Sequence, residues 1–338
     1  LCDQLEAAQE EREGRRNCLV AASVHRLNNG ADADAFREDA RFYFNHLPRL
    51  TSRPEHIQQL RQTILNLAVR GKLTPQDLNE EPAKLLLFQL TANAKAYAIE
   101  QGIAPPNPDP IAKENIEFPA PPGWEWVRLA LLFKVITDGD HQPPPKANDG
   151  VAFLTIGNIT TGKLDFSNCR FVEEKYWKSL SSYKKPGFGD ILYTVVGATY
   201  GRPAYVDTRR HFCVQRHVAI LKPTDQMNVR FLCSLLASPL VYEQATRSTT
   251  GTAQPTIPLR PLRNFLVLLP PLAEQNRIVT KVDELMALCD RLEAQLTTTQ
   301  TESRRLLEAV LHEALTEADH QELAATSCRS NIQETESR

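Results

Sequence analysis

The sequence predicts an α+β protein in which a mainly β domain lies between long helices. Three observations support this fold class: coiled-coil spacing near the C-terminus, a copy of part of that helix at the start of the chain, and short β-type runs between them. The chain has 338 residues, 42% of them hydrophobic, which is enough for a sizeable core. No apolar run is long enough to span a membrane and the first residues are not those of a signal peptide, so we expect a soluble, cytoplasmic protein.

The C-terminal helix is predicted over residues 273–315. Its apolar and small residues recur at alternating four- and three-residue steps, as in a coiled coil: Leu285, Cys289, Leu292, Leu296, Thr299, Ser303, Leu306 and Val310. We expect the polar residues 316–338 to form a frayed tail.

A seven-residue phrase occurs twice in the chain. "LCDQLEA" at residues 1–7 returns as "LCDRLEA" at residues 288–294, and the same register matches Leu19 with Leu306 and His25 with His312. We interpret this repeat as a duplicated structural unit. Residues 1–52 are therefore assigned to a first helix of the same kind and a connector.

Residues 53–122 are predicted to be a helical segment followed by a linker. Apolar residues at three- and four-residue steps from Ile57 to Ala68 predict a helix, and Gly71 offers a stop. The proline-rich stretches "GIAPPNPDP" and "FPAPPGW" exclude helix and central strand. Gly123 then begins a domain that extends to residue 272. Its predicted strands lie in "VAFLTIGNI", "KLDFSN", "GDILYTVVG", "RPAYVD", "HVAILKP" and "FLVLLP", with one helix in "FLCSLLASPLVYEQATR".

Charge is unevenly distributed along the chain. The formal net charge is −2, but residues 123–270 contain 18 Lys and Arg against 11 Asp and Glu. A basic middle between acidic flanks is typical of a polyanion-binding domain joined to protein-binding elements. Ordinary solvated charge is the alternative.

The sequence lacks a recognisable catalytic constellation. Asp109 has no Glu-x-Lys partner for a nuclease centre, and neither a phosphate-binding loop nor a methyltransferase-like Asn/Asp-Pro-Pro-Tyr motif is present. His211, Cys213 and His217 would share one face of a strand, but no further ligand pair has zinc spacing, so strand packing is the favoured interpretation. We expect no metal and no cofactor in this chain.

Polar and basic side chains on glycine-bearing loops of the basic domain are the candidate DNA contacts. Arginine can pair with guanine or phosphate, glutamine with adenine, and hydroxyls with phosphate. The candidates are His141, Gln142, Lys146, Tyr200, Arg202, Arg209, Arg210, Arg247, Thr249, Thr250, Thr252 and Gln254.

Several segments together resemble the specificity subunit of type I restriction-modification enzymes. "LPPLAEQNRIVTKVDELMALCDRLEAQL" (269–296) is very close to the family's pattern where a target recognition domain leads into a conserved helix. "LRQTILNLAVRGKLTPQDLNEEPAKLLL" (60–87) resembles the segment after the central conserved helix, and "PPGWEWVRL" (121–129) the start of a recognition domain. The pattern departs at Ala130, where the family often has glycine.

The resemblance implies a non-catalytic DNA-binding subunit that recognises half of a bipartite target. Separate modification subunits would methylate adenine, and a motor subunit would translocate and cleave, using S-adenosylmethionine, ATP and Mg. Full-size members have two recognition domains and two conserved helices. The single recognition domain, with a start at Leu1 and not at methionine, predicts the second half of such a subunit.

Three alternatives remain open at this point. Two copies of the chain could pair through their helices and recognise a symmetric bipartite site. The chain could be a self-sufficient nuclease or methyltransferase, although neither motif set is present. It could also be a coiled-coil assembly protein with an inert β domain.

Overall fold

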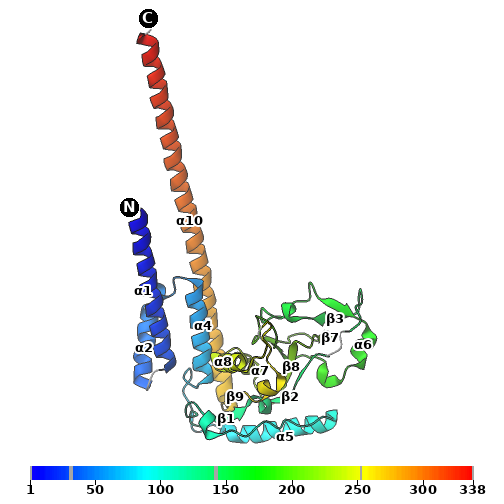
Figure 1. Cartoon of the computed structure of the whole chain (residues 1–338). Helices are drawn as coiled ribbons and strands as arrows, with labels where there is room; N and C mark the ends of the chain where they lie inside the picture. Colours follow the sequence, from blue (N-terminus) through cyan, green and yellow to red (C-terminus); the bar gives the residue numbers. More distant parts are fainter. Residues whose placement is uncertain (1, 30–32, 141–143, 252, 337–338) are drawn as a thin grey trace. The chain divides into compact units, whose positions relative to one another are not determined.

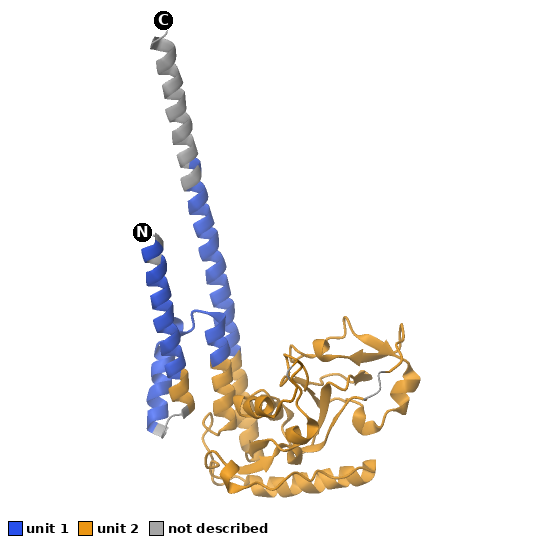
Figure 2. Cartoon of the chain, in the orientation of Figure 1, with its two compact units in different colours: residues 1–23, 31–59, 287–338 blue, residues 24–30, 60–286 orange. Residues whose placement is uncertain are grey.

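The computed structural model describes residues 2–29, 33–140, 144–251 and 253–336. The chain divides into two compact units (Figure 2). Unit 1 comprises residues 1–23, 31–59 and 287–338, and unit 2 comprises residues 24–30 and 60–286. None of the described helices is both long enough and apolar enough to cross a membrane.

Unit 1 is helical. It contains most of α1 (Cys2–Asn29), α2 (Ala33–Asn45), α3 (Leu47–Leu50), the start of α4 (Pro54–Val69) and α10 (Leu272–Glu336) from residue 287 onward. Residues 2–7 of the first copy and 288–294 of the second are therefore helical, as predicted. The helix α10 continues to Glu336, beyond the expected end at residue 315 and through the segment expected to fray.

The core of unit 1 is small and includes polar groups. Val20, Tyr43, Leu50, Ile57 and Cys289 are almost fully buried. Polar contacts join α1 to the segment from residue 52 to residue 56: Arg53 pairs with Glu13, Arg16 donates to Ser52, and His56 bonds Asn17.

Two helices of unit 2 end at glycines with positive φ. After α4 ends at Val69, Gly71 has φ of 69°, which confirms the predicted stop, and α5 (Ala83–Gln101) ends at Gly102 with φ of 64°. Glycine adopts this left-handed conformation without the steric cost of a side chain. The proline-rich residues that follow have no regular structure except the short 3₁₀ helix η1 (Lys113–Asn115).

The described residues of the β domain of unit 2 form three sheets. Figure 1 shows where this domain's strands lie. The strands β1 (Glu125–Arg128) and β9 (Leu266–Leu269) form an antiparallel pair. A four-stranded antiparallel sheet has the order β2 (Phe133–Asp138), β8 (Val218–Pro223), β5 (Ile191–Thr194), β6 (Pro203–Tyr205). A three-stranded sheet has the order β4 (Arg170–Val172), β3 (Val151–Leu154), β7 (Phe212–Val214), with β3 and β7 parallel. With its helices, the chain has the α+β fold that the sequence predicts.

Short helices complete the domain. The 3₁₀ helices are η2 (Leu129–Leu132), η3 (Ile156–Asn158) and η4 (Ser182–Lys184), and the α-helices are α6 (Glu174–Ser179), α7 (Val229–Leu236), α8 (Pro239–Ser248) and α9 (Leu259–Arg263).

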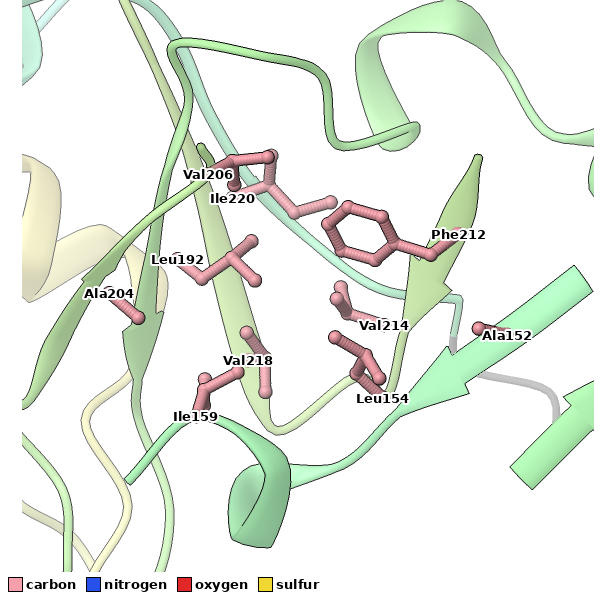
Figure 3. Close-up of a cluster of buried hydrophobic side chains, with 10 residues drawn as sticks. All are labelled: Ala152, Leu154, Ile159, Leu192, Ala204, Val206, Phe212, Val214, Val218 and Ile220. Carbon is pink, nitrogen blue, oxygen red and sulfur yellow. The ribbon is translucent and has the colours of Figure 1, made fainter. Parts of the chain in front are cut away.

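One hydrophobic core lies between the three-stranded and four-stranded sheets. Figure 3 shows that Leu154, Phe212 and Val214 from one sheet face Leu192, Val218 and other side chains of the second. Phe166 packs edge-on against Phe212, with ring centroids 5.6 Å apart. Alternate residues of short strands thus bury one face of each sheet against the other.

Three local predictions were wrong. "KLDFSN" contains no strand, because Asp165 accepts hydrogen bonds from the amide and hydroxyl of Ser167 and closes a turn. The strand in "VAFLTIGNI" stops at Leu154, where Thr155 and Asn158 form a capping box around η3. The single expected helix in "FLCSLLASPLVYEQATR" is two helices, α7 and α8, separated where Ser238 precedes Pro239.

Candidate nucleic-acid interface

Two candidate loops that are far apart in sequence lie side by side in unit 2. Residues 195–202 follow β5, and residues 249–257 follow α8. Gly197 N donates to Pro255 O at 2.9 Å, and Ile257 N donates to Val195 O at 2.8 Å. These bonds bring the loop with Tyr200 and Arg202 next to the loop with Thr249, Thr250 and Gln254.

Tyr200 is held on this paired-loop surface by α8. Its ring stacks on Tyr242 with centroids 5.6 Å apart and an interplanar angle of 9°, and its hydroxyl lies 2.9 Å from Thr246 Oγ1. Gly201 has φ of 82°, and a Cβ there would lie 3.0 Å from the Tyr242 ring. Glycine is thus required for the close approach of the loop to α8.

The arginines among the candidates occupy different surroundings. The exposed Arg202 donates from Nη1 to Thr160 O at 3.0 Å. Arg209 lies over Phe188 and Arg210 over Phe166, at 5.1 and 4.7 Å from the ring centroids. Both arginines are exposed, so these stacked cations are accessible to a ligand.

Arg247 lies on a more acidic surface than the other candidates. It forms ion pairs with Glu117 at 3.6 Å and Glu243 at 3.8 Å, beside a cavity that also contacts Glu114. Its charge is therefore largely compensated by neighbouring carboxylates, which makes Arg247 the least suited of the arginines to bind a polyanion.

Lys146 lies in a separate cavity of about 380 Å³. Arg170 on β4 and residues 215–217, between β7 and β8, also line this cavity, and sequence analysis did not select them as DNA contacts. In the sequence, Arg170 and Arg216 are isolated charges beside β-type runs. Nothing in the sequence indicates that they line the same cavity. His141, Gln142 and Thr252 lie outside the described residues.

The cavity is adjacent to the paired loops. Val195 N donates to His217 O at 3.1 Å, and the neighbouring pair Thr194 and Val218 is in register between β5 and β8. The backbone that begins the Tyr200 loop is therefore bonded directly to the backbone at the cavity.

The possible catalytic or metal residues have structural partners. Asp109 lies 3.8 Å from Arg260, and its backbone carbonyl accepts a bond from Arg128. Only Phe212–Val214 forms the strand in "HFCVQRH", and His217 lies in the turn after it, so the expected common face is not formed. Within the described part of the chain, no group of three or more His, Cys, Asp or Glu side chains is arranged to hold a metal ion.

Burial raises the pKa of the Cys213 thiol to about 12, and Cys213 packs with Phe153 and Val172. The thiol is therefore protonated at neutral pH and is a poor nucleophile or metal ligand. His211 instead stacks on Trp177, with ring centroids 4.3 Å apart. This is the strand packing that the sequence analysis favoured.

Comparison with known proteins identifies the family. Residues 121–299 match the family described as "Type I restriction modification DNA specificity domain". The chain belongs to this family. The match covers the whole β domain, including both candidate loops and the cavity.

The specificity-domain family includes curated relatives from Escherichia coli. The chain is 27% identical to the type I restriction enzyme EcoAI specificity subunit over 323 residues and 27% identical to the EcoEI specificity subunit over 329 residues. In both cases the match covers 93% of this chain and 54% of the relative. The chain thus spans about half the length of the curated relatives it matches.

The chain is also similar to solved structures, at lower identity. The crystal structure of the HsdS subunit from Thermoanaerobacter tengcongensis matches 90% of this chain and 58% of that chain, with 22% identity and a TM-score of 0.46. A structure described as the "Structural basis underlying complex assembly and conformational transition of the type I R-M system" matches 81% of this chain and 58% of that chain, with 22% identity and a TM-score of 0.47.

Proposed function

We propose that this chain is a DNA-recognition component of a type I restriction-modification complex. It recognises one half of a bipartite duplex target through the β domain and positions the adenine-methylating and DNA-cleaving subunits. The observation that supports this proposal most strongly is the family match over residues 121–299, which contain the paired candidate loops.

The chemistry of the loops suits this task. Arg202, Arg209 and Arg210 carry exposed guanidinium groups, and fixed guanidinium groups bind phosphates or guanine edges with directed bonds. The hydroxyls of Thr249 and Thr250 donate to the carbonyls of Thr246 and Thr256, at 2.9 and 3.4 Å, and would have to exchange these bonds for bonds to phosphate. Since the loop backbones are bonded to each other, Tyr200, Arg202, Thr249 and Thr250 share one surface before DNA binds. Arg209 and Arg210 lie on a separate segment, between β6 and β7.

The chemical steps are assigned to partners. In this proposal the chain is not itself an enzyme and acts in the cytoplasm, and the methyltransferase and motor subunits use S-adenosylmethionine, ATP and Mg. The target adenine leaves the base stack to reach a pocket in the methyltransferase subunit. The long helix α10 offers exposed apolar side chains for helix packing with a partner: Leu306, Leu307, Val310 and Leu311.

Directed methylation tests the proposal. A complete system containing the triple variant Arg202→Ala, Arg209→Ala, Arg210→Ala should methylate its sites more slowly or at relaxed sites, while co-purification with the methyltransferase subunit is unchanged. The matched control is Arg260→Ala, an exposed arginine on α9. Unchanged sites and rates in the triple variant would contradict the role of these loops.

A second candidate function is a self-paired specificity component that recognises a symmetric site. The exposed apolar residues of α10 favour it, because a second copy of the same helix could cover them. Light scattering of the purified chain measures whether it pairs with itself. A wild-type dimer that becomes a monomer with the double substitution Leu306→Glu and Val310→Glu supports self-pairing. A monomeric wild-type chain excludes it.

A further inference from the structure

The cavity that contains Lys146 is formed by two parts of the β domain. Phe153, Phe171 and Val172 from β3 and β4 provide its apolar wall. The turn from Gln215 to His217 forms the opposite side. Lys146, Arg170 and Arg216 are exposed at the cavity, so an apolar wall has three cations around it.

These cations are not neutralised within the protein. Lys146, Arg170 and Arg216 form no ion pair with any residue that the structure describes. The one carboxylate at the cavity, Asp140, lies 3.6 Å from Lys184 Nζ and accepts a bond from the Tyr176 hydroxyl at 3.4 Å. The local field therefore attracts an anion. The paired-loop surface is adjacent, because Val195, the first residue of its first loop, donates to the carbonyl of His217 at the cavity.

The backbone of the turn is fixed on both sides. Gln215 N donates to Leu154 O at 2.9 Å, Val218 N donates to Gln215 O at 2.9 Å, and His217 O accepts from Val195 N. Figure 3 shows that Val214 and Val218, which flank the turn, both point into the core. A turn anchored in this way presents its side chains in one geometry, as recognition of a base edge requires.

Gly139 allows a third element to approach this turn. A Cβ at residue 139 would lie 2.1 Å from Val214 O and 2.6 Å from Gln215 C. No side chain fits at that distance, so the end of β2 can reach the turn only with glycine. Gly139 is a positioning residue for the turn.

Arg216 is exposed, and its hydrogen bond to His217 uses only the Nε group. Burial, reinforced by the Arg216 charge, lowers the pKa of His217 and keeps the ring neutral. A neutral imidazole accepts at one nitrogen only. Arg216 Nε donates to His217 Nε2 at 3.2 Å and Gln215 Nε2 lies 2.8 Å from His217 Nδ1, so these contacts do not occupy the two Nη groups of Arg216.

We infer that the cavity is a second DNA-contact site, in which Arg216 binds a base edge and Lys146 and Arg170 bind the flanking phosphates of one strand. This inference rests on the proposed function. Arg216 is assigned to the base because arginine on a fixed turn can form two directed bonds to guanine O6 and N7. Lys146 offers a point charge from a loop, which suits phosphate.

Binding of the full chain to duplex DNA tests the inference. The preferred duplex is first selected from a random-sequence library with the wild-type chain, and fluorescence anisotropy then measures its affinity and that of each single-base variant. Arg216→Ala should lower discrimination at one base pair by about ten- to a hundredfold, with smaller effects elsewhere. Lys146→Ala and Arg170→Ala should weaken all duplexes alike and reduce the dependence of log affinity on log salt by about one each.

Matched controls separate local from general effects. Arg260→Ala and Lys175→Ala each remove one exposed cation outside the cavity and should leave discrimination and salt dependence unchanged. If Arg216→Ala keeps full discrimination while Arg202→Ala loses it, the cavity is not a recognition site and the proposed function stands. If the wild-type chain prefers no duplex, both proposals are overturned.

Discussion

Trp124 and Glu274 are 150 residues apart in sequence and are joined by a buried hydrogen bond. The indole Nε1 donates to the carboxylate Oε2 at 2.7 Å, and both residues are less than 5% exposed. Trp124 precedes β1, and Glu274 lies in the first turn of α10, so the bond ties the start of the β domain to the helix that follows it. Thr74 and Gln76 also donate to Oε1 of Glu274, at 3.2 Å each.

Trp124→Phe should lower the free energy of unfolding by about 2 kcal/mol, because it removes a buried donor from a charged acceptor. Burial already raises the pKa of Glu274, and losing a donor should raise it further. Urea denaturation measures the change. The matched control is Trp126→Phe, since the half-buried Trp126 donates only to the carbonyl of Phe118 and should cost less. If the two variants lose the same free energy of unfolding, the bond from Trp124 to Glu274 does not stabilise the fold more than the bond from Trp126 does.

Lys222→Met should destabilise the β domain by about 3 kcal/mol at pH 7, because it leaves Asp190 buried without its cation. Lys222 Nζ lies 2.5 Å from Asp190 Oδ2, and both side chains are almost buried. Burial raises the pKa of Asp190. Removing the cation should raise it further, so the loss should shrink as the pH falls and the carboxyl takes up a proton.

The control for this prediction is Lys134→Met. Lys134 also lies 2.5 Å from a carboxylate, but its partner Asp225 is 77% exposed, so the cost should be below about 1 kcal/mol. Adding Asp190→Asn to Lys222→Met should recover part of the stability. A double variant less stable than Lys222→Met would contradict this account.

Unit 1 should lose stability on acidification through His56. Burial lowers the pKa of His56, and its Nδ1 is buried without a hydrogen-bond partner while Nε2 bonds Asn17. Below about pH 6.5, His56 binds a proton more readily in the unfolded chain than in the folded protein. The free energy of unfolding therefore falls as the pH falls. Thermal unfolding at pH 7.5 and pH 5.5 should show a smaller difference for His56→Gln than for wild type. His46→Gln is the control in the same unit.

Gly139→Ala should displace the turn that contains Arg216. The added methyl group would overlap Val214 O, and the resulting shift should cost about 2 kcal/mol in stability. It should also reduce base discrimination at the position that Arg216→Ala affects. Gly157→Ala is the control, because the nearest atom to its Cβ lies 3.9 Å away. A stable Gly139→Ala protein with wild-type discrimination would argue against a positioning role.

The periodic parts of the fold followed from the sequence, and the irregular parts did not. Heptad spacing predicted the helix that contains Leu285 and Leu296, and a glycine stop predicted the end of α4, because these signals depend on neighbours within a few residues. The turn at Asp165 was not predicted, because hydrogen bonds from Ser167 to the Asp165 side chain form it within a run of strand-like residues. The break before Pro239 was not predicted, because the apolar pattern continues across it. The domain boundaries at residues 52, 122, 272 and 315 and the individual DNA contacts stay predictions.

By itself, the sequence determined the fold class, the repeated helix, the basic β domain and the resemblance to type I specificity subunits. Only the tertiary structure decided which polar residues meet. The loops that contain Tyr200 and Thr250 lie side by side because the residues after β5 and those after α8 exchange backbone hydrogen bonds. Lys146, Arg170 and Arg216 line one cavity because β4 and β7 flank the same strand, β3. Such contacts depend on strand order, which short apolar runs of similar composition do not specify.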